Sequence, residues 1–582
     1  MSQDARALSR IAKHGRIGIT PLALGLSLAT LAWTATSLAQ AQSWNGATPD
    51  WFTAGNWTPS GVPTNATNAT IDTSSPNAAV ISSGNAQAQT VIIGLSGTGG
   101  LTIQNGGTLS DSIGAIGRSL GSTGSATVDG AGSSWSNSAD LSVGYSGAGT
   151  LTIQNGATVS NQSGYIGRGL GSTGTVTVDG AGSSWTNHIA LYVGSSGTGT
   201  LTIQNGGTVS IGADGYIGAN SGGTGTVTVD GAGSSWTTSA NLFVGQNGTG
   251  TLTIKNGGAV SSVADGYIGY SAASTGTVTV TGAGASWTNP GNLYVGLDGT
   301  GTLTIADSGT VSNTTGTIGA NGGATGTVTV TGAGSSWTNS GSLSVGQDGT
   351  GTLTIAGGGA VSNTIGAIGA NSGSTGTVTV TGAGSSWTNS SNFYVGQNGT
   401  GTLTIAGGGA VSSLIGIIGG ASSSTGTVTV TGAGSSWTNS GTLDVGQSGT
   451  GVLTVANGGV VSASSVTLGY SALSTGTLNI GAASGQTAVA PGTLNTALVR
   501  FRTGTGSIVF NHTASNYIFA PVISGSFGTV TVEAGTTIFT AASNYTGATT
   551  VNGGTLAVNG SIVSSTTVNN GCLLYTSDAA DE

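Results

Sequence analysis

The sequence predicts an all-β fold, a right-handed parallel β-helix (β-solenoid) with about 25 residues per coil and with the coils paired into 50-residue repeats. Three observations lead to this prediction. Seven tryptophans recur at spacings of 50 or 51 residues, strand-like runs alternate between apolar residues and Thr, and 111 of the 582 residues are Gly. Gly marks tight turns that need positive φ. With only 5% charged residues and 8 Pro, the composition excludes a charge-driven disordered chain and a collagen triple helix.

Residues 1–41 have the pattern of a secretory signal peptide. Four of the nine basic residues lie in the first 16 positions, an apolar stretch runs from Pro21 to Ala35, and Ala39 and Ala41 form an A-x-A cleavage site. The alternative is a short membrane anchor, but about 15 apolar residues are fewer than a spanning helix needs. Removal of this segment leaves 17 acidic and five basic residues. Such an acidic chain cannot neutralise phosphates, so we expect no nucleic-acid partner.

Residues 42–90 differ from the repeats that come after them. Trp44, Trp51 and Trp57 cluster here, ahead of strand-like segments rich in Asn and Ala. Because the first coil of a solenoid exposes an unpaired edge, we interpret this region as an N-terminal cap.

Residues 91–481 contain the tandem 50-residue repeats. Each unit has two similar halves, and each half has three short β-rich segments separated by Gly, Asn, Asp or Ser. In segments such as 199–203, apolar residues alternate with Thr, which is the period of a strand with one buried face. One coil cannot bury that face alone, whereas stacked coils form a continuous core. A β-propeller with one blade per repeat is the alternative, but a blade gives no reason for the internal duplication.

The recurring tryptophans are the signature of the repeat. Trp236 falls in the half-repeat register of Val209, which the alternation places inside, so we expect the tryptophans to pack in the core. The competing interpretation is a row of exposed rings on which sugars stack. The signature residues are Trp135, Trp185, Trp236, Trp287, Trp337, Trp387 and Trp437.

Pairs of Thr recur on the outward side of the strand-like segments, for example Thr200 with Thr202 and Thr226 with Thr228. Ice-binding solenoids display arrays of this kind. Thr is also the best polar residue for an exposed strand, and we favour this second interpretation of the pairs.

Residues 482–571 continue the alternating strands with a different texture, and residues 572–582 end that texture abruptly. The final segment contains the single cysteine, Cys572, and resembles the translation of a sequencing adaptor. We therefore expect residues 572–582 to be an artefact and the natural C-terminal part to be missing. One Cys supports neither a disulfide nor, in this context, thiol catalysis.

Two blocks resemble known families. Over residues 91–480, the succession Leu-x-Val-Gly, Gly-Thr-Leu-Thr-Ile and Thr-Val-Thr-Val-x-Gly-Ala-Gly-Ser-Ser-Trp resembles the repeat of type V secretion (autotransporter) and PEP-CTERM-associated proteins. Residues 544–547 (Asn-Tyr-Thr-Gly) and 553–556 (Gly-Gly-Thr-Leu) resemble the autotransporter-associated β-strand repeat. The resemblance implies a passenger secreted to the cell surface or outer membrane of a Gram-negative bacterium. Its implied partners are its own C-terminal β-barrel, which we expect truncation to have removed, and an unidentified glycan or protein ligand.

The search for catalytic, cofactor-binding and metal-binding residues gives no candidate set. His188 and His512 are isolated, and no Ser has a His and Asp partner set. Asp129, Asp179 and Asp230 share one register, two coils or about 9.6 Å apart. That distance is near the outer limit for an inverting glycosidase pair, but a pair would not need three members. We interpret these carboxylates as turn caps.

The sequence thus favours a non-enzymatic surface passenger, either adhesin-like or a structural stalk. Two alternatives stay open: an exopolysaccharide-associated surface protein of the PEP-CTERM type, and a carbohydrate-active β-helix enzyme. A carbohydrate-active β-helix enzyme needs acidic and basic residues gathered in one groove, and the sequence has only five basic residues after position 41.

Overall fold

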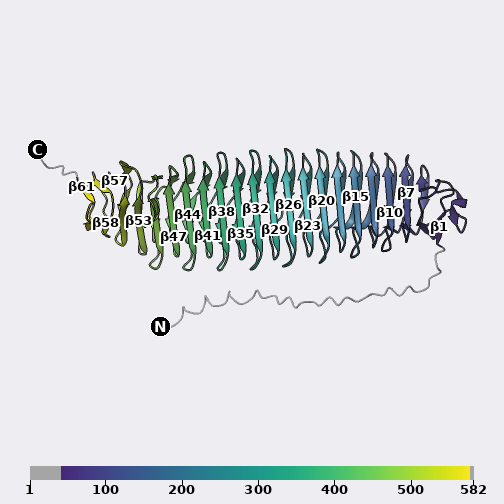
Figure 1. Ribbon diagram of the computed structural model, residues 1–582, viewed down its shortest axis with the longest axis horizontal. Helices are drawn as coiled ribbons and strands as arrows, with labels where there is room; N and C mark the ends of the chain where they lie inside the picture. The colour runs from purple at the N-terminus through teal and green to yellow at the C-terminus, as the bar shows by residue number, and fades with distance from the viewer. Residues whose placement is uncertain (1–40, 577–582) are drawn as a thin grey trace, which may run out of the picture. The chain divides into compact units, whose positions relative to one another are not determined.

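The computed structural model describes residues 41–576, which form one continuous stack of β-coils (Figure 1). The predicted signal peptide, including Ala39, lies outside the described residues except for Ala41, and so do residues 577–582. Most coils contribute three strands, and equivalent strands of successive coils pair in parallel. This arrangement confirms the predicted parallel β-solenoid of about 25 residues per coil. Within the described residues, the one helical turn is η1 (Ala54–Asn56).

The first sheet, here called the long-strand face, contains the longest strands. From β7 to β50 its strands begin every 25 or 26 residues and pair without any shift in register. Figure 1 shows these strands side by side and pointing the same way. The strands of the long-strand face are β4 (Ala79–Ile81), β7 (Thr98–Gln104), β10 (Thr123–Asp129), β13 (Ala148–Gln154), β15 (Thr173–Asp179), β17 (Thr198–Gln204), β20 (Thr224–Asp230), β23 (Thr249–Lys255), β26 (Thr275–Thr281), β29 (Thr300–Ala306), β32 (Thr325–Thr331), β35 (Thr350–Ala356), β38 (Thr375–Thr381), β41 (Thr400–Ala406), β44 (Thr425–Thr431), β47 (Thr450–Ala456), β50 (Thr475–Gly481), β53 (Thr505–Asn511), β56 (Gly528–Ala534), β58 (Thr549–Val551) and β60 (Thr566–Val568).

The second sheet carries the signature tryptophans. Two of its strands, β14 and β16, run on without interruption into the third sheet. The strands of the second sheet are β5 (Asn85–Gln87), β8 (Thr108–Asp111), β11 (Ser134–Asn137), β14 (Thr158–Ile166), β16 (Ser184–Val193), β18 (Thr208–Ile211), β21 (Ser235–Thr238), β24 (Ala259–Ser262), β27 (Ser286–Asn289), β30 (Thr310–Asn313), β33 (Ser336–Asn339), β36 (Ala360–Asn363), β39 (Ser386–Asn389), β42 (Ala410–Ser413), β45 (Ser436–Asn439), β48 (Val460–Ser462) and β51 (Thr493–Asn495).

The third sheet is built from strands of three or four residues, together with the second halves of β14 and β16. A glycine with positive φ ends most of these strands and turns the chain toward the long-strand face. Its strands are β3 (Asn68–Ile71), β6 (Thr90–Ile93), β9 (Ile113–Ile116), β12 (Leu141–Val143), β19 (Gly215–Ile217), β22 (Leu242–Val244), β25 (Gly266–Ile268), β28 (Leu293–Val295), β31 (Gly316–Ile318), β34 (Leu343–Val345), β37 (Gly366–Ile368), β40 (Asn392–Val395), β43 (Ile415–Ile418), β46 (Leu443–Val445), β49 (Val466–Leu468), β52 (Leu498–Phe501) and β55 (Val522–Ser524).

The N-terminal end of the stack is closed by a tryptophan cluster. Strands β1 (Gln42–Trp44) and β2 (Trp57–Thr58) pair antiparallel, and β1 also pairs with β3. The rings of Trp44 and Trp51 both meet Trp57 edge to face, at centroid distances of 5.1 and 4.8 Å. All three side chains are buried, so they cover the apolar interior of the first coils.

The C-terminal end of the stack departs from the regular coil length. The long strands there begin at Thr475, Thr505, Gly528, Thr549 and Thr566, so the coil first lengthens to 30 residues and then shortens to 17. A separate four-stranded sheet replaces the second sheet and consists of β54 (Tyr517–Phe519), β57 (Thr536–Phe539), β59 (Thr555–Val558) and β61 (Leu573–Thr576).

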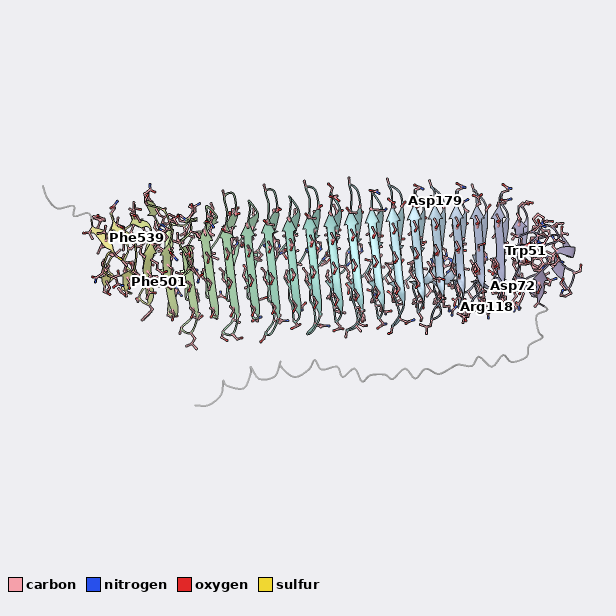
Figure 2. All side chains as sticks on the ribbon, viewed as in Figure 1. Trp51, Asp72, Arg118, Asp179, Phe501 and Phe539 are labelled. Atoms are coloured by element: carbon pink, nitrogen blue, oxygen red, sulfur yellow. The ribbon has the colours of Figure 1, made fainter. Side chains whose placement is uncertain are left out.

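The core is one continuous column of inward side chains. All seven signature tryptophans have no exposed surface, and Trp236 pairs in register with Val209. They therefore offer no ring face for sugar stacking. Toward the C-terminus phenylalanines such as Phe501 and Phe539 take over the core, whereas Trp51 lies at the other end (Figure 2).

Candidate functional site

The three aspartates that share a register lie at the ends of strands β10, β15 and β20. Each is separated from the next by an intervening coil, which presents a glutamine at the same position. Each carboxylate accepts a hydrogen bond from the side-chain amide of an asparagine in the following coil. The donor–acceptor pairs are Asn155 to Asp129 at 2.7 Å, Asn205 to Asp179 at 2.7 Å and Asn256 to Asp230 at 2.8 Å.

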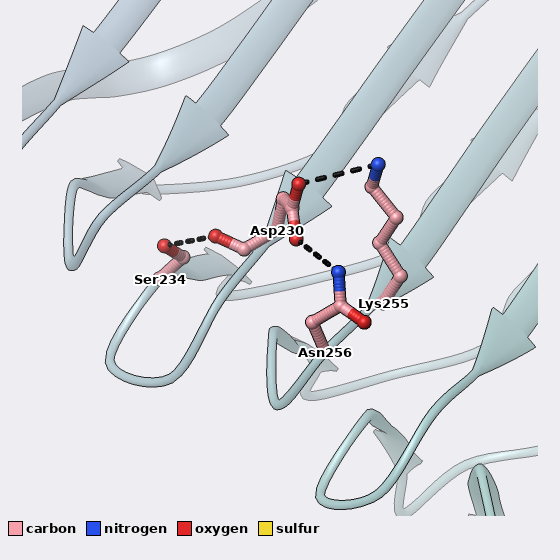
Figure 3. A network of polar contacts seen from close by, with 4 residues as sticks. All are labelled: Asp230, Ser234, Lys255 and Asn256. Carbon is pink, nitrogen blue, oxygen red and sulfur yellow. Dashed lines mark hydrogen bonds and ion pairs between the residues drawn. The ribbon is translucent and has the colours of Figure 1, made fainter.

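The network around Asp230 shows what these carboxylates do (Figure 3). Its second carboxylate oxygen lies 3.2 Å from Nζ of Lys255, and Ser234 Oγ donates to the Asp230 backbone carbonyl at 2.7 Å. Later in the chain, Thr occupies the strand position that these aspartates hold. There the direction of the contact is reversed, and Thr281 donates to Asp307 of the following coil at 3.0 Å. The contacts tie each turn to its neighbour, as expected for turn caps.

The two histidines outside the predicted signal peptide lie far apart in the fold. His188 is exposed on β16, whereas His512 is fully buried with Nε2 2.9 Å from Oγ1 of Thr537. Burial lowers the pKa of the His512 imidazole. In residues 41–576, no group of three or more His, Cys, Asp or Glu side chains could hold a metal ion.

A ladder of stacked aromatic rings runs along the outside of the third sheet, and sequence reasoning missed it. Neighbouring rings lie 4.7 to 5.2 Å apart and are tilted by at most 9°. The ring faces cover one another, and Tyr216 and Tyr267 donate to Asp214 and Asp265 at 3.0 and 3.1 Å. The ladder is therefore self-contained and stabilises the stack. Its members are Tyr165, Tyr192, Tyr216, Phe243, Tyr267 and Tyr294.

A cationic–aromatic cluster lies at one end of this ladder. The Arg168 guanidinium lies 4.2 Å from the Tyr165 ring centroid and pairs with Asp140 at 3.7 Å. Both Arg118 and Arg168 lie about 5 Å from the ring of Tyr145. The cations are thus engaged by partners within the protein.

A groove with a volume of about 510 Å³ lies on the long-strand face between β47 and β58. Its lining includes Asn479, Ser484, Ser507, Val509 and Glu533. The loop 482–491, which lengthens this coil, contributes Ser484 to the wall. The signal in the sequence is the loss of the regular Thr pairs after residue 450, whereas the change of texture was predicted only from residue 482 onward. Because a loop on a rigid sheet is a common setting for binding residues, this groove is the candidate functional site.

No helix within residues 41–576 has the length and apolar character required to cross a membrane.

Comparison with known proteins links one segment to a named repeat. Residues 532–558 match the model of the passenger-associated transport repeat, which confirms the resemblance seen in residues 544–556. Among solved structures, the chain is similar to the crystal structure of a TibC-catalyzed hyper-glycosylated TibA fragment. The identity is 20%, the alignment covers 62% of this chain and 96% of that chain, and the TM-score is 0.33. No curated protein matches the chain.

Proposed function

We propose that this chain, which carries a passenger-associated transport repeat, is a secreted, non-enzymatic surface passenger of an autotransporter that acts as an adhesin or as a structural stalk. The observation that supports this most strongly is the position of the repeat. The matched segment 532–558 begins in β56, which pairs with β53, and β53 pairs with β50 of the regular stack. The transport repeat and the tandem repeats therefore belong to one solenoid.

The architecture suits export of an unfolded chain followed by folding outside. Each coil contacts only its neighbours, so coils can be added one at a time as the chain emerges. The sequence contains a single Cys, so no intramolecular disulfide can lock the chain before export.

The non-enzymatic part of the proposal rests on the state of the carboxylates. The three aspartates in one register each accept a hydrogen bond from an asparagine of the next coil. A glycosidase would need two free carboxyl groups on opposite sides of a bound sugar.

Surface display tests the passenger proposal. The full chain is fused to the outer-membrane barrel of an autotransporter and produced in a Gram-negative host, and intact cells are treated with proteinase K. We expect the chain to be degraded on intact cells while a periplasmic marker protein stays whole. Degradation only after lysis would contradict the proposal.

A sugar-release screen separates the passenger from a carbohydrate-active enzyme. Purified chain is incubated with a panel of polysaccharides, and reducing ends are measured. We expect no release. Turnover by the unmodified chain that Asp179→Asn or Asp230→Asn abolishes would establish the enzyme instead.

A further inference from the structure

The long-strand face changes its chemistry at the C-terminal end of the repeats. From β13 to β44, both central outward positions are Thr in every strand, as in Thr402 and Thr404 of β41. In β47, β50 and β53, Val452, Asn479 and Val509 each replace one of these threonines. The uniform row of threonines thus ends in a short stretch where Asn479 and Val509 are buried, at 2% and 4% exposed, and the half-buried Val452 presents methyl groups.

The wall of the groove is fixed to the sheet by a buried amide. The loop 482–491 crosses beside β53, where Asn511 is 3% exposed. Its Nδ2 donates to the backbone carbonyls of Ala483 at 3.0 Å and Gln486 at 2.8 Å. A buried side chain that satisfies two loop carbonyls holds the loop in one position, so the wall is a built part of the fold.

Glu533, on β56, holds the same loop at Ser484 and Gly485. The pairing of β53 with β56 shifts register at this residue, so Glu533 is the extra residue of a β-bulge. Its carboxylate accepts hydrogen bonds from the Ser484 hydroxyl and from the Gly485 backbone amide, the latter at 3.0 Å. Bulges re-aim side chains, and they are common beside binding sites.

The floor of the groove holds a polar group that the protein leaves unsatisfied. Asn479 is 2% exposed and donates to Oγ1 of Thr454 at 3.1 Å, but its amide oxygen has no partner. Ser507 and Thr531 add half-buried outward hydroxyls beside it, and the half-buried Val452 adds a methyl surface.

The lining excludes several classes of ligand. Glu533 is the one charged residue among those that line the groove, so an anion finds no cation there. The same carboxylate already accepts two hydrogen bonds, and no second carboxylate stands beside it to hold a cation. The floor is a sheet face whose strands are paired on both sides, so a peptide cannot add as a further strand.

We propose that this groove binds a short segment of a neutral oligosaccharide. Hydroxyl, amide and methyl groups, with one carboxylate that is already hydrogen-bonded, match the hydroxyl and C–H surfaces of a neutral sugar, and about 510 Å³ lies within the usual range for ligand pockets. The inference rests on the proposed adhesin function and assigns its ligand class. No aromatic ring lines the groove, so single-site binding is weak and many copies on a cell would supply avidity.

Binding of neutral hexasaccharides to the full chain tests this proposal. Saturation-transfer-difference NMR and calorimetry use cellohexaose, maltohexaose, xylohexaose and mannohexaose, with hexagalacturonate as the acidic probe. The blocking variant is Ser507→Tyr, which fills the groove from an outward position. The matched control is Thr402→Tyr, at the equivalent outward position of β41 on the same face. Ala483→Tyr, on the wall, is a second blocking variant in case the first does not fold.

We expect at least one neutral hexasaccharide to bind the unmodified chain and Thr402→Tyr equally. A folded blocking variant should lose that binding at least tenfold, and hexagalacturonate should bind to none of them. The proposal is overturned if no neutral hexasaccharide binds the folded chain, if the blocking variants bind as well as the control, or if the acidic probe binds best. Loss of sugar binding with intact surface display would leave the passenger proposal standing, whereas loss of display would overturn the passenger proposal instead.

Discussion

Each core tryptophan needs an acceptor for its indole N–H, and the residue below it in the preceding coil determines whether it has one. Trp185, Trp337 and Trp387 each donate to an asparagine of the preceding coil at 2.6 Å. Trp236, Trp287 and Trp437 donate to nothing. The three acceptors are Asn161, Asn313 and Asn363. In the coils that precede Trp236, Trp287 and Trp437, the same position of the second sheet holds Ile211, Ser262 and Ser413.

Ser413→Asn should stabilise the protein by supplying the acceptor that Trp437 lacks. An asparagine there would also donate to Asn439, as Ser413 does now at 2.6 Å. One buried hydrogen bond is worth about 1 kcal/mol, so we expect the free energy of unfolding to rise by that order. The reverse change, Asn363→Ser, should lower it by a similar or larger amount. Denaturant titration measures both, and a loss of stability in Ser413→Asn would contradict the account.

Asp111 stands in the same row of buried polar residues, but as a carboxyl group. It accepts from Trp135 Nε1 at 3.3 Å, as Asn161 does from its own tryptophan. Asn161 also donates a hydrogen bond to Asn187 at 2.8 Å. An ionised Asp111 has no proton with which to donate to Asn137 in the same way. Accordingly, Asp111 Oδ2 and Asn137 Oδ1 both lack partners. By analogy with Asn161, which donates to Asn187, a proton on Oδ2 would let Asp111 donate to Asn137.

Asp111→Asn should therefore stabilise the protein at neutral pH and remove a pH dependence. Burial raises the pKa of Asp111 well above its usual value, while the groups facing it, the Trp135 indole and the Val91 backbone amide, do not titrate near neutral pH. Between the unfolded pKa, about 3.9, and the raised folded pKa, the folded state binds more protons than the unfolded state. Its stability therefore falls as pH rises through that window.

Denaturant titration at pH 5 and pH 8 measures this effect. We expect the unmodified chain to lose stability between the two values and Asp111→Asn to lose less, with Asp129→Asn, at a turn, as the control. Equal pH dependence in the unmodified chain and Asp111→Asn would show that Asp111 is ionised in the folded state and that Asn137 has turned its amide toward it.

At the residue scale, the sequence predicted where the tryptophans point but not what their N–H groups meet. The inward direction of Trp236 follows from the alternation along one strand. The acceptors for these indoles come from a different coil about 24 residues earlier, and Asn, Ser, Ile and Asp all occupy that row. Only the register between coils shows which tryptophan has a partner.

At the scale of elements, one turn glycine per coil fixes the path from the third sheet to the long-strand face. Gly194 has φ of +68°, and a Cβ placed on it would collide with the backbone carbonyl of Thr224 in the next coil. Gly222 has φ of +81°, but a Cβ there would meet nothing within 4 Å. A substitution at Gly222 therefore adds only backbone strain, whereas a substitution at Gly194 adds the same strain and a collision between coils.

Gly194→Ala should destabilise the protein more than Gly222→Ala. The second change costs only the strain of positive φ, on the order of 1–2 kcal/mol. The first adds a backbone collision that the coils can relieve only by moving apart. Thermal denaturation of both variants measures the difference, and equal melting temperatures would contradict the close approach at Gly194.

The sequence predicted the strands better than the decoration of their outer faces. The seven-residue segments alternate long enough to define a buried face, and they form the long-strand face as expected. The third-sheet strands mostly have three or four residues, too few to show a period. The ladder through Tyr192 and Tyr216 was therefore hidden until the coils were placed in register.

At the scale of the whole molecule, the fold follows from repetition and the groove from its interruption. A period of 25 residues requires each coil to lie on the last, so the architecture and core were predictable from the spacing of the tryptophans. The groove depends on loop 482–491 meeting Glu533, a contact across about 50 residues. Nothing in the local sequence marks that meeting, because it depends on a bulge in the pairing of β53 with β56.

Labelling of single cysteines on intact cells tests the central claim, that this solenoid is a surface-exposed passenger. Cys572 is replaced by Ser in the full chain fused to an autotransporter barrel, and Leu473→Cys, at a turn position that is 95% exposed, is compared with Leu478→Cys, which has no exposed surface. A membrane-impermeant maleimide should label Leu473→Cys on intact cells and Leu478→Cys only after denaturation. Labelling of Leu473→Cys only after lysis, or equal labelling of both on intact cells, would contradict the account.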